Sequence, residues 1–141
     1  MSGDPDRVTE VAKLHIETFR RGRPSDGIYA EEVKDHHGSS GQKGGAAGLL
    51  EAGQWLREAV PNLEVTVRST IADPPYASVR WTIAGTHTGA PMLGYPAKGQ
   101  PIEIHGGDVI KIGSDGRITD LWHVEELWKL RQQLEGEAPQ V

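Results

Sequence analysis

The spacing of apolar residues changes once along this chain, at Pro61, and this change most limits what the chain can fold into. Before Pro61, apolar side chains recur every three or four residues, as on the buried face of a helix. After Pro61 they alternate with polar side chains, as in strands with one buried face. Helices followed by consecutive strands predict an α+β fold, in which the helices pack on one face of an antiparallel sheet.

The part of the chain before Pro61 predicts three helices. Residues 7–21 form an amphipathic pattern that a Gly/Pro-containing segment ends, and residues 45–60 form another that Pro61 ends. Residues 27–35 predict a short helix between them. The stretch 36–41 is rich in glycine and serine, so we expect it to be a loop.

The part after Pro61 predicts four strands and a short final helix. The strands cover residues 63–67, 77–83, 102–112 and 117–124, and the helix covers residues 125–134. A curved antiparallel sheet backed by helices encloses a cone-shaped cavity, and such cavities are natural sites for small molecules.

Composition excludes several classes of function. The 141 residues fit a single domain, residues 1–141, and the 15 basic and 20 acidic residues give a net charge of −5, which disfavours nucleic-acid binding. The chain has no cysteine, which excludes disulfides, thiolate metal sites and cysteine nucleophiles. No apolar run approaches the ~18 residues of a membrane span. The first residues lack the pattern of a secretion signal, so we expect a soluble, cytoplasmic protein without membrane partners.

Asp108 is the strongest candidate for chemistry. It shares the strand phase of the apolar residues Ile102, Ile104, Ile110 and Ile112, so the pattern directs a carboxylate toward the apolar face. Burying a carboxylate is costly, and proteins respond by raising the pKa of such a group or by supplying hydrogen-bond partners. A carboxylate in this setting suits a general base that removes a proton next to a carbonyl. The alternative is an aspartate at a bulge, pointing to solvent.

Two histidines, His105 and His36, are the other candidate catalytic residues. His105 has the opposite strand phase and would face the same cavity only if Gly106-Gly107 formed a bulge; otherwise it is exposed. His36, followed by His37, ends the predicted short helix, where it either orients a substrate oxygen or caps a surface helix. Adjacent residues rarely converge on one ion, and helical His-Glu-x-x-His spacing is missing, so we expect no metal site.

Five further residues are candidates for contacting a substrate. Trp81, Trp122 and Tyr95 offer flat walls for a polycyclic ligand, although single aromatic residues also serve as simple core. His87 and His123 have an ambiguous phase. Because His123 follows Trp122 directly, at most one of these two side chains faces the cavity.

Several segments together resemble a known family. The stretches are Val79–Gly89, Leu93–Gly99, Gly107–Ile112, Asp115–Ile118 and Leu121–His123. Over roughly residues 7–134 the chain resembles the SnoaL-like polyketide cyclases, which belong to the cone-shaped superfamily of nuclear transport factor 2 and ketosteroid isomerase. The catalytic aspartate of this family lies in a Gly-x-Asp-x-x-Arg motif. Residues 106–111 match it, with Asp108 as the aspartate and Lys111 in place of arginine.

The resemblance implies a cofactor-free enzyme of secondary metabolism, such as antibiotic biosynthesis, that cyclises or isomerises a polyketide-like carbonyl compound. Asp108 would take the proton, and His36 or His105 would polarise or reprotonate an oxygen. Two alternatives stay open. One is a hydroxylase relative that needs a reductant or partner protein, and the other is a ligand-binding protein without catalysis. An interior carboxylate favours an enzyme over a protein that only binds a ligand. Because relatives of this fold commonly associate, we also expect a homo-oligomer, either a dimer or a tetramer.

Overall fold

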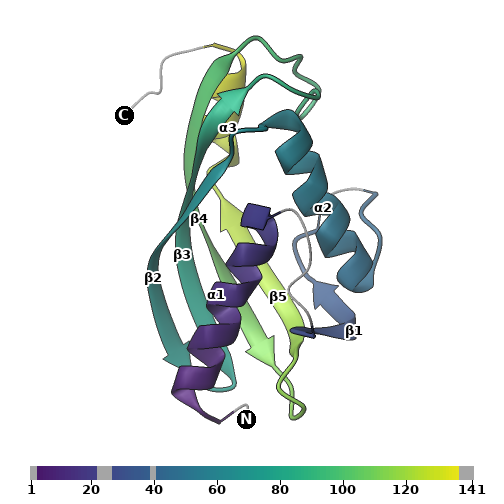
Figure 1. Ribbon diagram of the computed structural model, residues 1–141, viewed down its shortest axis with the longest axis vertical. Coiled ribbons are helices and arrows are strands. Elements are labelled where there is room, and N and C mark those ends of the chain that lie inside the picture. The colour runs from purple at the N-terminus through teal and green to yellow at the C-terminus, as the bar shows by residue number, and fades with distance from the viewer. Residues whose placement is uncertain (1–2, 22–26, 39–40, 137–141) are drawn as a thin grey trace.

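The computed structural model describes residues 3–21, 27–38 and 41–136, and Figure 1 shows their arrangement. In chain order the elements are α1 (Pro5–Arg21), β1 (Tyr29–Asp35), α2 (Gly45–Ala59), β2 (Glu64–Asp73), β3 (Tyr76–His87), β4 (Gln100–Ile112), β5 (Ile118–Glu125) and α3 (Leu127–Leu134). The five strands form one sheet in the order β1-β5-β4-β3-β2.

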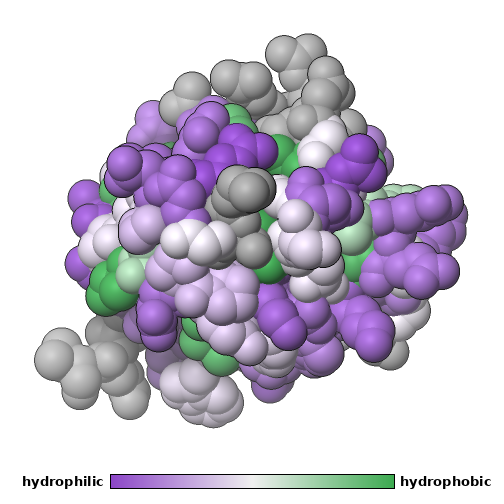
Figure 2. All heavy atoms as spheres, turned by 90° about the horizontal axis from the view of Figure 1, so that it is seen from below, coloured by the Kyte–Doolittle hydropathy of each residue, from purple (hydrophilic) through white to green (hydrophobic). Residues whose placement is uncertain are grey.

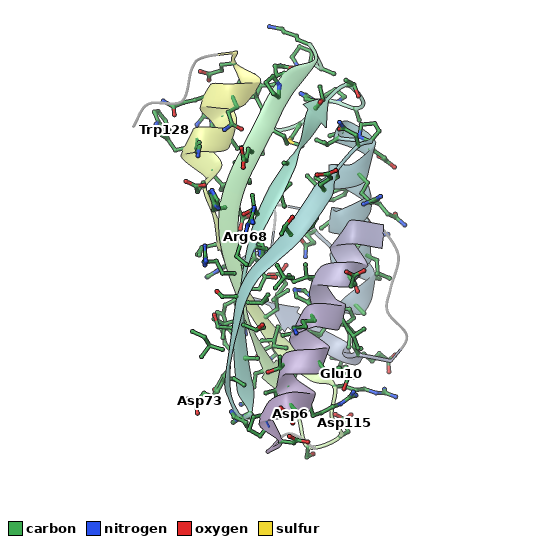
Figure 3. The ribbon with its side chains drawn as sticks, turned by 60° about the vertical axis from the view of Figure 1, so that its left-hand side comes forward. Asp6, Glu10, Arg68, Asp73, Asp115 and Trp128 are labelled. Atoms are coloured by element: carbon green, nitrogen blue, oxygen red, sulfur yellow. The ribbon has the colours of Figure 1, made fainter. Side chains whose placement is uncertain are left out.

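Two of the three helices cover one side of a curved sheet. Helices α1 and α2 lie against the same face, and α3 packs at the end of the sheet where β4 begins (Figures 1 and 3). The predicted α+β architecture, with a curved sheet packed by N-terminal helices, is therefore confirmed.

The prediction of a short helix over residues 27–35 is wrong, because this segment is strand β1. It pairs in parallel with β5, so the sheet is mixed rather than wholly antiparallel. Its apolar residues are Ile28, Tyr29, Ala30 and Val33, and this spacing matches neither the alternation of a strand nor a full helical stripe. Backbone hydrogen bonds decide between them: the Ile118 N–H donates to Ile28 O, and the His36 N–H donates to Leu121 O. Pairing with a distant strand thus outweighs the local pattern.

The inner face of the sheet forms the core with α1. Alternate residues of β4 are buried, namely Ile102, Ile104, Asp108, Ile110 and Ile112, so the predicted phase is confirmed. Helix α1 presents Val8, Val11, Ala12, His15 and Ile16 to this face, all of them buried. The contact between α1 and β4 therefore buries two titratable side chains, His15 and Asp108, among apolar neighbours.

The molecular surface is largely polar. Figure 2 shows hydrophilic residues over most of one end of the molecule, with hydrophobic residues as scattered spots. Trp128 on α3 is 71% exposed and lies at the periphery in Figure 3. Within the described residues, no helix is long and apolar enough to cross a membrane.

Candidate active site

Asp108 lies in the middle of the sheet, and both of its carboxylate oxygens have a partner. The residue is only 4% exposed. The indole Nε1–H of Trp81 donates to Oδ1 at 2.8 Å, and Nε2 of His15 lies 2.6 Å from Oδ2. A protein can accommodate a buried carboxylate by giving it hydrogen-bond partners, and here both partners are present. Trp81 comes from β3 and His15 from α1.

Gly106 makes the contact between Trp81 and Asp108 possible. Trp81 pairs with Gly106 across β3 and β4, and its indole ring lies over this glycine. A Cβ atom on Gly106 would lie 2.3 Å from the indole Cη2 and 2.7 Å from Val124 O, far inside van der Waals contact. The glycine therefore provides the space through which the indole reaches the carboxylate.

Tyr29 forms a second layer behind Asp108. Its hydroxyl oxygen lies 2.5 Å from Nδ1 of His15, and the two rings meet edge to face at 81°. Burial raises the pKa of Tyr29 far above its ordinary value, the charge of Asp108 raises it further, and a hydrogen bond with Thr18 partly offsets both. Tyr29 is therefore a neutral phenol, and a hydrogen-bonded chain runs from Trp81 through Asp108 and His15 to Tyr29.

Asp108 and Trp81 line a cavity of about 220 Å³. Most of its wall is apolar and comes from the helices and from β2, β3 and β4: Ile16, Leu49, Ala52, Leu56, Val65, Ile83, Ile104, Leu127 and Leu130. Its remaining lining residues are polar, namely Asp35, Gln42, His123 and Glu125. The cavity is thus an apolar chamber with one polar side, which is the usual composition of a small-molecule site.

The polar side is organised around His123. This residue is the direct cross-strand partner of Asp108, so the two side chains share one face of the sheet. Its Nδ1–H donates to Glu125 at 2.9 Å and its Nε2–H to Asp35 at 3.1 Å. The hydrogen bonds to Asp35 and Glu125, strengthened by their charges, outweigh burial and raise the pKa of His123 from 6.5 to about 10. We call Asp35, His123 and Glu125 the imidazolium clamp.

Asp35 is the more buried acid of the clamp. Burial would raise the pKa of Asp35, but the hydrogen bonds from His123 and Gln42 dominate together with the charge of His123, and the pKa falls below its ordinary value. Gln42 donates to Asp35 at 3.0 Å. With both acids ionised and His123 protonated, the clamp carries a net charge of −1.

Three of the eight predicted site residues line the cavity: Asp108, Trp81 and His123. The predicted choice between Trp122 and His123 is settled in favour of His123. Trp122 lies on the opposite face of the sheet, where the ring of His36 stacks on it with centroids 4.7 Å apart. His36 is exposed, donates to Asp120 at 2.9 Å, and borders an open groove between β1 and α2. These two residues are therefore separate from Asp108.

The other three predicted residues also lie outside the cavity. The β3–β4 register runs through residues 106 and 107 without a bulge, so His105 stays on the outer face, 3.1 Å from Thr82 Oγ1. His87 is fully buried at the end of β3, where its Nε2–H donates to Ala90 O. Tyr95 donates its hydroxyl to Glu135. The expectation that His105 and His36 share a site with Asp108 is wrong in this geometry.

The sequence interpretation missed His15, Tyr29 and the two acids of the clamp. His15 had a usable signal, because it is four residues after Val11 and three after Ala12 on the apolar stripe of α1. A histidine on an apolar stripe needs a buried partner. Asp35 and Tyr29 carried no such signal, since their segment was interpreted as a helix.

The clamp has the residue types of a metal site but not the geometry. The two ring nitrogens of His123 each face a different carboxylate, so the imidazole lies between the acids rather than beside them. In the part of the chain that the structure describes, no group of three His, Asp or Glu side chains converges as metal ligands.

Comparison with known proteins places the chain in a family. The family model of SnoaL-like polyketide cyclases matches residues 9–134. The chain belongs to this family. The match includes Asp108, both residues that hold it, and the imidazolium clamp. A comparison with curated proteins found no match.

Solved structures share the fold of this SnoaL-like protein. TsrD from Streptomyces laurentii is 23% identical, with 93% of this chain and 96% of that chain covered and a TM-score of 0.82. AclR from Streptomyces galilaeus, described as a proposed hydroxylase, is 18% identical, with 98% and 86% covered and a TM-score of 0.79. A proposed SnoaL-like polyketide cyclase from Jannaschia sp. CCS1 is 16% identical, with 98% of each chain covered and a TM-score of 0.80. At these identities the structures support the fold alone.

The contact between Trp81 and Asp108 predicts a difference between two neighbouring glycines. Gly106→Ala should displace the indole and break its hydrogen bond to Asp108, at a cost of about 1–3 kcal/mol of overpacking. At Gly107 an added Cβ meets only Val79 O, at 3.5 Å, so Gly107→Ala should leave stability and the contact unchanged. Urea unfolding and the indole N–H resonance of Trp81 test both. Equal behaviour of the two variants would contradict the predicted role of Gly106.

The clamp predicts that His123 stays protonated in the physiological range. Because its folded-state pKa of about 10 exceeds 6.5, its stabilising contribution is complete below about pH 6.5 and is lost as the pH rises through about 10. NMR titration of the imidazole should show no deprotonation between pH 6 and 8. Asp35→Asn removes the largest cause of the shift and should lower the pKa of His123. A midpoint near 6.5 in the wild type would contradict the clamp.

Proposed function

We propose that this protein catalyses an enolisation step, which leads to cyclisation or isomerisation of a compact, neutral, polyketide-like carbonyl compound. Asp108 acts as the general base without a cofactor. The observation that carries the proposal is a buried carboxylate that lines a largely apolar cavity and is held by Trp81 and His15, one at each oxygen. A carboxylate positioned beside an apolar cavity suits a general base that removes a proton next to a carbonyl.

The hydrogen bonds of the cavity favour a substrate whose C–H bond is already acidic. In the described lining, Trp81 donates its N–H to Asp108, and His123 donates both of its N–H groups to the clamp acids. These donors are therefore already used and do not bind a developing enolate oxygen strongly. A substrate with a second carbonyl or an aryl group beside the reacting carbon stabilises its own enolate. Polyketide chains, with carbonyls on alternate carbons, meet this condition.

The charges of the cavity favour neutral substrates. Asp108 and the clamp together place three carboxylates and one imidazolium around the space, apart from residues behind the lining. An anionic ligand would be repelled in this low-dielectric setting, whereas a hydroxyl or phenol can donate to a carboxylate. The volume of about 220 Å³ lies below the roughly 300–1,000 Å³ of drug-sized sites, which favours a one- or two-ring compound or one end of a longer one.

A pair of bicyclic ketones of equal size tests the base assignment. 2-Tetralone has a C–H bond that is both benzylic and next to the carbonyl, and 1-tetralone does not. In both ketones a C–H proton next to the carbonyl can exchange with D₂O. We expect the protein to accelerate this exchange more in 2-tetralone than in 1-tetralone. Asp108→Asn should reduce the acceleration about 10²–10⁴-fold, because the basic oxygen is lost.

The control for this experiment is His105→Gln, which lies on the other face of the sheet and should exchange at the wild-type rate. An Asp108→Asn variant that exchanges as fast as the wild type would end the assignment. A protein that binds 2-tetralone without any acceleration would instead support a ligand-binding protein.

Three naphthalene probes test the proposed substrate class. 2-Naphthol offers a donor, 2-methoxynaphthalene offers none, and 2-naphthoate carries a negative charge. We expect 2-naphthol to bind most tightly and 2-naphthoate at least about tenfold more weakly, a difference of ~1.4 kcal/mol. Glu125→Gln should reduce the discrimination against 2-naphthoate, while the control Glu103→Gln, exposed outside the cavity, should not. Calorimetry measures the three affinities, and tight binding of 2-naphthoate would refute the charge argument.

We further propose that the chain forms a homo-oligomer through the outer face of the sheet. Ile71, Ser78, Val109 and Trp122 lie in one cross-strand row on that face, and Ile71 and Val109 are 69% and 37% exposed. Exposed apolar side chains gathered on one face are typical of an interface. Light scattering should give a multiple of the mass of one chain, and Ile71→Lys should lower it. A monomer mass for the wild type would contradict this proposal.

A further inference from the structure

The lining of the Asp108 cavity becomes more exposed in one direction along the chain. Asp108 is buried, whereas its cross-strand partner His123 and the next inward-facing residue of β5, Glu125, are partly buried. Leu127, two residues further along, is 49% exposed. Among the described residues that line the cavity, Leu127 is the only exposed one. The mouth of the cavity therefore lies at Leu127, where β5 ends and α3 begins.

Helices α2 and α3 form the rim of this mouth. The later half of α2 and the whole of α3 lie towards the same end of the molecule (Figures 1 and 3). Ala52 and Leu56 lie four residues apart on one face of α2, line the cavity and are partly buried. Leu130 lies three residues after Leu127 on α3, lines the same cavity and is buried. The rim is therefore largely aliphatic, and α3 continues from it into the cavity wall.

The polar side of the cavity offers the other candidate opening. Asp35 and Gln42 line both the cavity and the open groove between β1 and α2, so these two side chains separate one space from the other. Gln42 donates to Asp35 at 3.0 Å, and His123 donates to Asp35 at 3.1 Å. A ligand that passed here would have to break these hydrogen bonds. At Leu127 the side chain is aliphatic and already half exposed, so the passage there breaks no such bond.

We propose that Leu127 is a specificity-determining residue, which sets how long a substrate the cavity accepts. The reacting ring lies inside, beside Asp108, and an apolar distal part of the substrate leaves between Leu127 on α3 and Leu56 on α2. The cavity of about 220 Å³ holds only the reacting end of such a compound. The carboxylate of Glu125 near the rim disfavours an anionic distal part. This inference rests on the proposed function, because it extends the same substrate class to longer compounds with a compact reacting end.

Two isomeric naphthols test where a longer ligand leaves the cavity. 6-Hexyl-2-naphthol carries its chain at the end opposite to the hydroxyl, and 3-hexyl-2-naphthol carries the same chain beside the hydroxyl. With the hydroxyl at Asp108, only the first isomer can pass its chain through the mouth. Calorimetry should show that it binds at least as tightly as 2-naphthol, because each methylene against the aliphatic rim strengthens binding by up to about fourfold. The second isomer should bind at least about tenfold more weakly. Equal affinities for the two isomers would overturn the proposal.

Substitutions at the two candidate openings test the role of Leu127. Leu127→Trp narrows the mouth, so it should lower the affinity for 6-hexyl-2-naphthol at least about tenfold more than the affinity for 2-naphthol. Trp128→Ala is the matched control, because Trp128 is the next residue of α3, is exposed and does not line the cavity. Lys43→Trp narrows the open groove instead, since Lys43 lines only the groove. Selective loss of the longer naphthol in Lys43→Trp, with wild-type binding in Leu127→Trp, would refute the assigned mouth.

Intermolecular NOEs locate the chain of the ligand without depending on a variant for the result. The methyl signals of Leu127 are identified by their loss in Leu127→Ala. In the wild-type complex with 6-hexyl-2-naphthol, we expect NOEs from the hexyl chain to the Leu127 methyl groups and from the naphthalene ring to those of Leu130. NOEs from the hexyl chain to Gln42, with none to Leu127, would place the chain in the groove and contradict the proposal.

Failure of this proposal is distinguishable from failure of the proposed function. If Asp108→Asn exchanges the proton of 2-tetralone normally but Leu127→Trp rejects the longer naphthol, the base assignment falls and the mouth stands. If Asp108→Asn abolishes the exchange but Leu127→Trp binds both naphthols as the wild type does, the base assignment stands and the mouth falls. A wild-type protein that binds 2-naphthol but neither hexyl isomer would also overturn the mouth, because the cavity would then accept compact compounds only.

Discussion

The burial of the Asp108 carboxylate is the constraint on which the rest of this structure depends. Moving an ionised carboxylate out of water costs several kcal/mol even after relaxation. The fold offsets this cost with two N–H donors that come from different layers, Trp81 in the sheet and His15 in α1. The pair with His15 ties the first helix to the middle of β4, across 93 residues of chain. The contact with Trp81 in turn requires a glycine at position 106, so one carboxylate constrains three elements.

Sequence patterns predicted the parts of the site that depend on local periodicity. The alternation in β4 placed Asp108 on the buried face, and the same rule separated His123 from Trp122. The patterns failed where pairing between distant strands decides. Segment 27–35 has too few apolar residues to distinguish a helix from a strand, and its pairing with β5 makes it a strand. Asp35 reaches His123 only because of that pairing. His105 depended on a bulge that the backbone register does not contain.

The polar side of the cavity illustrates a second limit of sequence reasoning. Whether a histidine is a proton carrier or a fixed cation depends on its neighbours in space. His123 was a candidate substrate contact, but its two nitrogens are both bonded to carboxylates, which holds it as an imidazolium. The fold is shared by proteins described as polyketide cyclases and as a hydroxylase, so the fold alone does not choose between these reactions. Here the contacts within the cavity are the basis on which we propose a neutral substrate with an acidic C–H bond.

The central claim is that Asp108 faces the bound ligand inside the cavity. A crystal structure with 2-naphthol, which resembles the enol form of a bicyclic ketone, tests it most directly. We expect the bicycle among Leu56, Ile83 and Leu130, with its hydroxyl about 2.5–3.0 Å from an oxygen of Asp108. Trp81 and His15 should keep their contacts with the carboxylate. A ligand bound instead in the open groove beside His36, with the Asp108 cavity empty, would contradict the claim.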